Sequence, residues 1–199
     1  MKTLAIVSGG LDSVVMAHLD QHLGAILSFD FGKPVHQAEL LYARMCAARL
    51  EVPWKVVGLG YVGEELVDSP ILGTPNRNAI MLSIAFGIAA SKGYDQVSIG
   101  VNAEDGSNYP DCRPAFLNFF NQVGRLGLKG GPEVNLVTPF IGRTKAEIVS
   151  AGSIVGVPFE LTWSCYKGGE LHCGICRACK GRKSAFISAG VKDTTSYQP

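Results

Sequence analysis

Short apolar runs alternate along the chain with longer stretches of helical character. Runs of this length, bounded by turn-forming residues, are typical of buried strands. They cover residues 3–8, 25–30, 54–59, 96–101 and 134–138. The stretches between them predict helices over residues 13–22, 36–50, 78–91, 114–126 and 144–155. This alternation predicts an α/β fold of Rossmann-like type, in which helices cover both faces of a parallel sheet.

Two segments depart from the regular alternation. Residues 78–91, NAIMLSIAFGIAAS, are apolar almost all round and predict a central buried helix. Residues 60–77 contain several glycines and prolines and predict a loop for most of their length.

Polar segments follow three of the predicted strands. They are residues 8–13, the loop after residues 28–33 and residues 102–113. Ligands of open parallel sheets bind beyond the carboxyl ends of the strands. We therefore expect these segments to converge on one site.

The segment SGGLDS, residues 8–13, has the features of a phosphate-binding loop. Gly9 and Gly10 let the backbone turn tightly and approach a ligand. The following helix directs free N–H groups and a partial positive charge at the loop, and Ser8 and Ser13 add hydroxyls. No Gly-Lys-Ser/Thr follows, so this is not a Walker A loop. Because Asp12 would repel phosphate directly, the loop implies Mg²⁺ between them. The plainer alternative is a turn in which Asp12 caps the helix.

Lys145 lies in GRTKAEI, residues 142–148, at the start of a predicted helix. In such a fold its side chain would reach the same phosphates. The alternative is a lysine that faces solvent.

Four cysteines crowd the C-terminal part of the chain with the spacing C-x7-C-x2-C-x2-C. They are Cys165, Cys173, Cys176 and Cys179. Four thiolates at such spacing predict a closed, structural Zn²⁺ site. An iron–sulfur cluster, or His172 in place of one sulfur, are the alternatives. We interpret Cys112, which stands alone, as a small buried residue.

Composition narrows the class of protein further. The 199 residues suit a single domain, which we divide into a nucleotide-binding part over 1–160 and a metal-binding segment over 161–199 packed on it. A net charge of +1 gives no sign of a nucleic-acid or membrane-surface partner. No apolar run approaches the roughly 18 residues of a membrane span, and the N-terminus lacks a signal-peptide pattern. These features predict a cytoplasmic protein.

SGGLDS at the end of the first strand resembles the pyrophosphate loop of the ATP pyrophosphatases, which cut ATP between its α and β phosphates. The resemblance implies an adenine nucleotide alpha hydrolase-like fold. It also implies that Ser8, Gly9, Gly10, Asp12 and Ser13 bind ATP and Mg²⁺ together with Lys145, with Asp12, Ser13 and Lys145 among the catalytic groups.

Taken in order, SGGLDS, FDFG, RNAIMLSIA, GVNAEDGSNYPDCR and the four-cysteine tail resemble the 7-cyano-7-deazaguanine synthase family of queuosine biosynthesis over nearly the whole chain. The resemblance implies a homodimeric ligase that adenylates 7-carboxy-7-deazaguanine with ATP. Ammonia then gives the amide, and a second ATP activates the amide so that the nitrile forms. AMP and pyrophosphate are the by-products.

Polar residues of the third and fourth of these motifs are candidates for the substrate site. They are Arg77, also a catalytic candidate, and Asn78, Asp105, Tyr109, Asp111 and Arg113. A carboxylate such as Asp105 can accept hydrogen bonds from a guanine-type ring, and Tyr109 can stack on it. Plainer roles are open as well: Arg77 as a cap on loop carbonyls, Asp111 as the N-cap of the next helix.

The chain departs from the family pattern near the expected substrate entrance. The family has Tyr-Gly-Gln-Arg-His where this chain reads FGKPVH, so we expect His36 to replace the family histidine after a one-residue insertion. PNRN stands in place of PGRN, and the connector before Arg77 is shorter than in the family.

These departures leave two alternatives open. One is a synthase-like ligase that joins the same acid to another amine, on a protein or a nucleic acid, as in antiviral or phage systems. The other is a zinc-ribbon module that binds nucleic acid through the basic residues of 177–183, a stretch that is more often a solvated helix face.

Overall fold

The computed structural model describes residues 1–66 and 74–199. Its centre is a five-stranded sheet of order β3-β2-β1-β4-β5, in which every neighbouring pair is parallel. The strands are β1 (Thr3–Ile6), β2 (Leu23–Asp30), β3 (Trp54–Gly58), β4 (Gln96–Ile99) and β5 (Asn135–Val137). The predicted α/β class is confirmed, with each strand within a few residues of its expected place.

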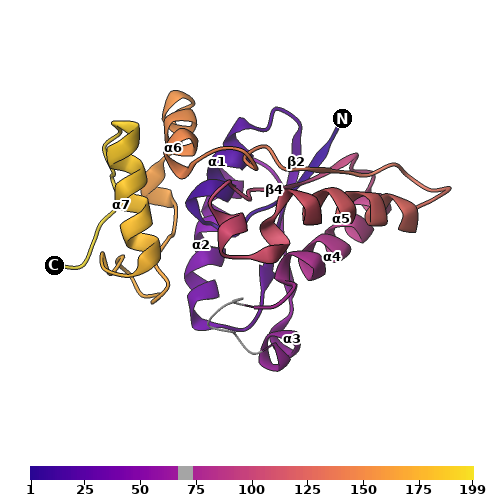
Figure 1. The fold of residues 1–199 in the computed structure, drawn as a ribbon, viewed down its shortest axis with the longest axis horizontal. Helices are drawn as coiled ribbons and strands as arrows, with labels where there is room; N and C mark the ends of the chain where they lie inside the picture. Colours follow the sequence, from indigo (N-terminus) through magenta and orange to yellow (C-terminus); the bar gives the residue numbers. More distant parts are fainter. Residues whose placement is uncertain (67–73) are drawn as a thin grey trace.

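Helices cover both faces of the sheet (Figure 1). The α-helices are α1 (Leu11–Leu19), α2 (Pro34–Arg49), α3 (Gly60–Glu65), α4 (Arg77–Lys92), α5 (Pro114–Gly127), α6 (Lys145–Ile154) and α7 (Arg177–Ala189). The described residues also form the short 3-10 helices η1 (Asp105–Ser107), η2 (Pro110–Cys112) and η3 (Phe159–Leu161).

Each face of the sheet has its own apolar core. Ala5 and Val7 pack with residues of α1, α2 and α6 on one face. Leu4 and Ile6 pack with residues of α4 and α5 on the other. Because successive side chains of a strand point to opposite faces, a strand buried on both sides reads as a continuous apolar run.

The loop predicted for residues 60–77 is wrong at its start, where α3 forms. A Cβ at Gly63 would overlap the carbonyl oxygen of Phe31, so this glycine lets the helix pack closely against the segment after β2. Residues 67–73 of the predicted loop lie outside the described residues.

The prediction of a central buried helix for 78–91 is also wrong in part. Helix α4 buries Leu82, Ala85, Phe86 and Ala89 against the sheet, whereas its opposite face, with Ser83 and Gly87, is exposed. With Ser83 and Gly87 on its exposed side, the helix covers one face of the sheet and is not buried all round.

The C-terminal segment packs against the helices on one side of the sheet. Helices α6 and α7 lie together, far from α4 and α5 (Figure 1). Arg182 of α7 is only 1% exposed and donates to Asp193, Thr162 and the carbonyl of Phe159, so the expected solvated face is wrong at this residue. No helix among the described residues is long and apolar enough to cross a membrane.

Candidate functional site

A cavity of about 310 Å³ opens at the carboxyl ends of β1 and β4. These strands are neighbours in the sheet but not in the sequence, so the chain leaves them in opposite directions. A crevice at such a switch point is where open α/β sheets bind their ligands. A larger hollow of about 500 Å³ beside α5 and β5, lined by residues 122 and 125–126 and 128–134, contains none of the expected site residues.

Most of the residues expected from the sequence line this one cavity. They are Ser8, Gly10, Asp12, Ser13, Arg77, Asn78, Asp105, Tyr109 and Lys145. His36 lines it too, buried, with Nδ1 accepting a hydrogen bond from the N–H of Phe31. Gly9, Asp111 and Arg113 are not among the lining residues.

The first loop has the internal hydrogen bonds of a preformed turn. Ser13 Oγ donates to the carbonyl of Gly10 at 3.0 Å and accepts from the N–H of Ser8 at 3.2 Å. Gly10, the N-cap of α1, provides no side-chain acceptor for the first turn. The N-terminus of this helix therefore offers N–H donors to an anion in the cavity.

The two glycines of this loop have different roles. Gly9 has φ +82°, and a Cβ there would overlap the carbonyl oxygen of Glu39 in α2. Its lack of a side chain therefore makes room for helix α2. A Cβ at Gly10 would lie 3.6 Å from the carbonyl of Trp163, an ordinary contact, and 3.2 Å from Ser8 Oγ, a tight contact that a small shift of the serine side chain would relieve.

Asp12 and Lys145 form an ion pair at the floor of the cavity, with Nζ and Oδ2 3.1 Å apart. Asn102 Nδ2 donates to the same oxygen at 3.1 Å. The other oxygen, Oδ1, is buried and has no hydrogen-bond partner among residues 1–66 and 74–199. A buried carboxylate oxygen without a partner fits a ligand of a hard cation such as Mg²⁺.

Acidic groups around Lys145 keep it charged. Burial alone lowers its pKa, but the paired Asp12 and the nearby Asp105 and Glu104 outweigh this and raise the pKa above its usual value. Burial and the Asp12 charge raise the pKa of Asp105, although the N–H of Asn102, which donates to it at 3.1 Å, opposes them. Lys145 therefore presents a permanent positive charge to the cavity.

The start of α4 is fixed by the loop after β4. The N–H of Asn78 donates to Asp111 Oδ2 at 2.8 Å, and its side-chain amide donates to the carbonyl of Asp111 and to Cys112 Sγ. Asp111 thus caps α4, not the helix that follows it in sequence. Asn76, at the place of the family glycine, has φ +51°, a conformation that asparagine tolerates better than most residues.

Arg113 and Cys112 both lie on the loop after β4 but differ in exposure. Arg113 is exposed and donates from Nε to the carbonyl of Gly106. Cys112 is buried, as expected, and burial with the nearby Asp105 and Asp111 raises the pKa of its thiol to about 12. A thiol of that pKa is not a nucleophile at neutral pH.

Sequence reasoning missed part of the cavity wall. The missed residues include Glu39, Met81, Trp163, Ser164 and Tyr166. Burial raises the pKa of Glu39 to about 7, opposed by the charge of Arg77. The signal that could have found it is its position one helical turn after His36.

The C-terminal segment supplies one side of the cavity. The N–H of Trp163 donates to the carbonyl of Gly9 at 2.8 Å, and its ring stacks on Tyr42 of α2. Arg177 donates to Asn108, and Tyr166 contacts Tyr109, on the loop after β4. The cysteine-rich segment thus touches both loops of the cavity.

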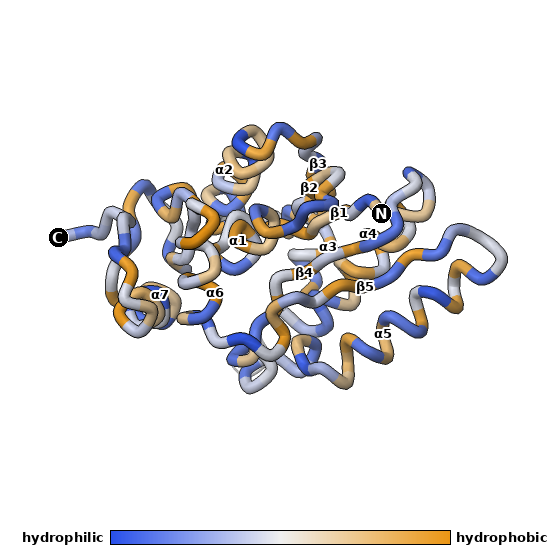
Figure 2. Tube along the Cα trace, turned by 90° about the horizontal axis from the view of Figure 1, so that it is seen from above, coloured by the Kyte–Doolittle hydropathy of each residue, from blue (hydrophilic) through white to orange (hydrophobic). Residues whose placement is uncertain are grey.

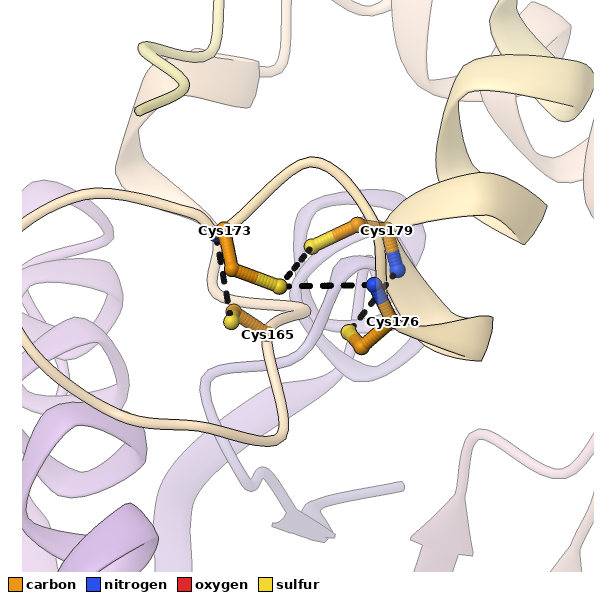
Figure 3. A group of neighbouring side chains, drawn as sticks. All are labelled: Cys165, Cys173, Cys176 and Cys179. Carbon is orange, nitrogen blue, oxygen red and sulfur yellow. Dashed lines mark hydrogen bonds between the residues drawn. The ribbon is translucent and has the colours of Figure 1, made fainter. Parts of the chain in front are cut away.

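The four cysteines gather at one point beside this wall (Figure 3). Cys176 and Cys179 lie at the start of α7, and the Sγ atoms of all four lie within 4.8 Å of one another. The Sγ atoms of Cys173 and Cys179 are 3.9 Å apart. Two sulfurs bound tetrahedrally to one ion by bonds of ~2.3 Å would be roughly 3.8 Å apart, so the observed distance is close to that of a metal site. Backbone N–H groups donate to the sulfurs of Cys165, Cys173 and Cys176. This donor set fits a single metal ion.

Curated relatives match this chain over its whole length. The 7-cyano-7-deazaguanine synthases of Brucella ovis and Mesorhizobium japonicum are 44% and 45% identical, over 100% of this chain and 94% of theirs. The alignments span 219 positions against 199 residues here, so the relatives contain insertions relative to this chain.

Solved structures show the same fold at low identity. A U34-tRNA thiolase, NcsA, from Methanococcus maripaludis has a TM-score of 0.58 at 17% identity; the match covers 93% of this chain and 63% of the thiolase, less than two thirds of its length. An NMN synthetase from Francisella tularensis has a TM-score of 0.55 at 15% identity, over 96% of this chain and 78% of the synthetase.

A family model described as "Queuosine biosynthesis protein QueC" matches residues 62–190. This stretch contains the start of α4, the loop after β4, Lys145 and all four cysteines. Together with the full-length relatives, it shows that this chain belongs to the 7-cyano-7-deazaguanine synthase family.

Proposed function

We propose that this protein is an ATP-dependent carbon–nitrogen ligase that converts 7-carboxy-7-deazaguanine and ammonia to 7-cyano-7-deazaguanine. The observation that carries the proposal is the cavity between β1 and β4, where the ion pair of Asp12 and Lys145 lies beside the uncapped start of α1. Membership of the synthase family gives the substrate.

The end of the cavity at β1 is the proposed ATP site. The N–H groups at the start of α1 and the hydroxyls of Ser8 and Ser13 bind the phosphates, and Lys145 neutralises the pyrophosphate as it leaves. When bound, Mg²⁺ supplies positive charge between Asp12 and the phosphates, and the unpartnered Oδ1 of Asp12 is its proposed ligand.

The opposite end is the proposed site of the deazaguanine. Arg77 binds the carboxylate before activation, Tyr109 and Tyr166 contact the ring, and Asp105 accepts hydrogen bonds from its N–H groups. Asn78 lines this end and holds the loop of Asp111 in place. Neither Arg113 nor Asp111 lines the cavity, so in this proposal they hold the loop after β4 in its conformation and do not contact the substrate.

The metal of the cysteine cluster is proposed to be Zn²⁺. Four thiol ligands leave no open position for a substrate, which is typical of a structural zinc site. Bound there, Zn²⁺ holds Trp163, Ser164 and Tyr166 against the cavity.

The two other functions considered from the sequence are less well supported. Relatives matched over 94% of their length are named as synthases, which favours nitrile formation over conjugation to another amine. Arg182 is buried in an ion pair with Asp193, so the surface of residues 177–183 is less basic than the sequence suggested. This disfavours a zinc-ribbon module that binds nucleic acid.

We also propose a cytoplasmic homodimer. Helix α5 alternates polar and apolar stretches along its length (Figure 2), and its outer side exposes Phe119, Val123 and Leu126 at helical spacing. A second copy of the chain would cover this stripe. Light scattering of the purified protein measures its mass, and Val123→Glu should halve it if the stripe is the contact.

Release of AMP and pyrophosphate tests the ligase directly. The protein with ATP, Mg²⁺ and 7-carboxy-7-deazaguanine should release both when ammonium is added. Asp12→Asn keeps an acceptor for Asn102 but removes the charge, and it should lower this rate by roughly 10²–10⁴-fold. Asp20→Asn, after the end of α1, is the matched control and should leave it unchanged. No AMP from the unaltered protein would overturn the proposal.

A further inference from the structure

Glu39 lines the cavity but has no place in the binding steps proposed above. It lies on α2, and its backbone carbonyl packs directly against Gly9 of the phosphate loop. The positive charge of Arg77, which lines the same cavity, lowers the pKa of the Glu39 carboxyl, against the larger effect of burial. Glu39 therefore shares one cavity with the proposed phosphate loop and with Arg77 of the proposed carboxylate site.

The proposed reaction removes protons from nitrogen in each half. Ammonium gives up two protons on its way to the amide NH₂: one before its lone pair attacks the acyl carbon, and one as the C–N bond is completed and the C–O bond to AMP breaks. In the second half the amide nitrogen loses its two remaining protons as AMP leaves and the nitrile forms. A base beside the activated carboxyl is needed for these transfers.

The charged groups that face Glu39 restrict which side chain can serve as that base. Those in the same cavity are Asp12, His36, Arg77, Asp105 and Lys145. Asp12 is paired with Lys145, and Asp105 accepts from the N–H of Asn102. Nδ1 of His36 accepts from the N–H of Phe31.

We propose that Glu39 is the general base that takes protons from the ammonia nitrogen. This inference rests on the proposed function and deepens it. The carboxylate binds ammonium, accepts one proton so that neutral ammonia attacks the acyl adenylate, and returns the proton to solvent before the next transfer. Its pKa of about 7 matches this task, since a base works best when its pKa lies near the working pH.

Hydroxylamine separates this role from binding or activation. It is already unprotonated at neutral pH and attacks acyl adenylates to give a hydroxamate without help from a base, whereas ammonia is mostly ammonium. Glu39→Gln should lower amide and nitrile formation from ammonium by ~10²–10⁴-fold, and hydroxamate formation should stay close to the rate of the unaltered protein. The exposed Glu64→Gln is the control and should change neither rate.

Three results would overturn the proposal. One is unchanged product formation from ammonium in Glu39→Gln, and another is an equal fall with both nucleophiles, which would make Glu39 a binding partner of Arg77 only. If the variant does not fold, the pH profile of the unaltered protein decides: the rate with ammonium should level off above pH about 7. A continued rise of about tenfold per pH unit would mean that only free ammonia reacts and no base acts on ammonium. Failure of the proposed function would look different, because the unaltered protein would then release no AMP.

Discussion

Folding changes the protonation of Glu39. Burial raises its pKa from 4.5 to about 7, so between these values the folded protein keeps a proton that the unfolded chain has lost. The stability that this proton contributes is complete below pH 4.5 and is lost as the pH rises through 7. Glu39→Gln does not ionise, so it should be more stable than the unaltered protein at pH 8 by roughly 1–3 kcal/mol and equally stable at pH 4.

Urea unfolding at both pH values measures this difference. Glu64→Gln, on the exposed side of α3, should show no such dependence. A stability gain of Glu39→Gln that is the same at pH 4 and pH 8 would mean that ionisation is not its cause.

Single residues of the site were predictable from the sequence where one local motif contains them. Ser8, Asp12 and Ser13 belong to one turn, and Lys145 starts a helix after a capping threonine. Glu39 and Trp163 were not predictable, since they reach the cavity only when α2 and the C-terminal segment pack on Gly9.

Among the elements, the turn from β1 into α1 makes a sharp prediction about its two glycines. Gly9→Ala should destabilise the protein by at least ~1–3 kcal/mol, because φ +82° strains any other residue and the new methyl group would push α2 away. Gly10→Ala has an ordinary φ, and its one tight contact, 3.2 Å to Ser8 Oγ, involves the end of a side chain that can shift. Its loss of stability should therefore be well below that of Gly9→Ala.

Thermal or urea unfolding of the two variants checks this order. Equal losses would contradict the assignment of Gly9 to packing against α2. Loss of ATP cleavage in Gly10→Ala without loss of stability would instead place a ligand against Gly10.

The elements themselves followed from the sequence with two exceptions that have physical causes. Helix α3 has glycines at two of its positions, which disfavour a helix in isolation; packing of Gly63 against Phe31 outweighs this. In α4, alanine, serine and glycine fill the positions between large residues, so an apolar segment became a helix with one exposed face. The orientation of the polar loop after β4 was not predictable, because η1 and η2 turn Asp111 and Arg113 out of the cavity.

At the scale of the whole molecule, the four-cysteine cluster is connected to the cavity through the residues that neighbour Cys165. Trp163 and Tyr166 flank Cys165 and line the cavity, and Trp163 Nε1 donates to the carbonyl of Cys165 at 2.8 Å. Removal of the metal should therefore abolish ATP cleavage, although no cysteine is expected to touch ATP. The sheet, with its two separate cores, should persist.

A chelator titration, followed by metal analysis, far-ultraviolet circular dichroism and AMP release, measures this coupling. Cys176→Ser should behave like the chelated protein, and Cys46→Ser, a buried thiol outside the cluster, is the control. Undiminished AMP release from metal-free protein would contradict the coupling.

The overall architecture was predictable because alternating strands and helices leave few topologies. The carboxyl ends of parallel strands lie at one edge of the sheet, which brings the loops after β1 and β4 to the same edge; that β1 and β4 are direct neighbours is a property of the observed strand order. The place of the C-terminal segment depends on long-range contacts such as that of Trp163 with Gly9, which no local pattern encodes.

Mass spectrometry of the products tests the central claim most directly. Purified protein with ATP, Mg²⁺, 7-carboxy-7-deazaguanine and ammonium should yield the nitrile together with AMP and pyrophosphate. Amide or adenylate that accumulates without nitrile would contradict the synthase activity and leave only the activation half. No AMP at all would contradict the assignment of the loop at residues 8–13 to ATP.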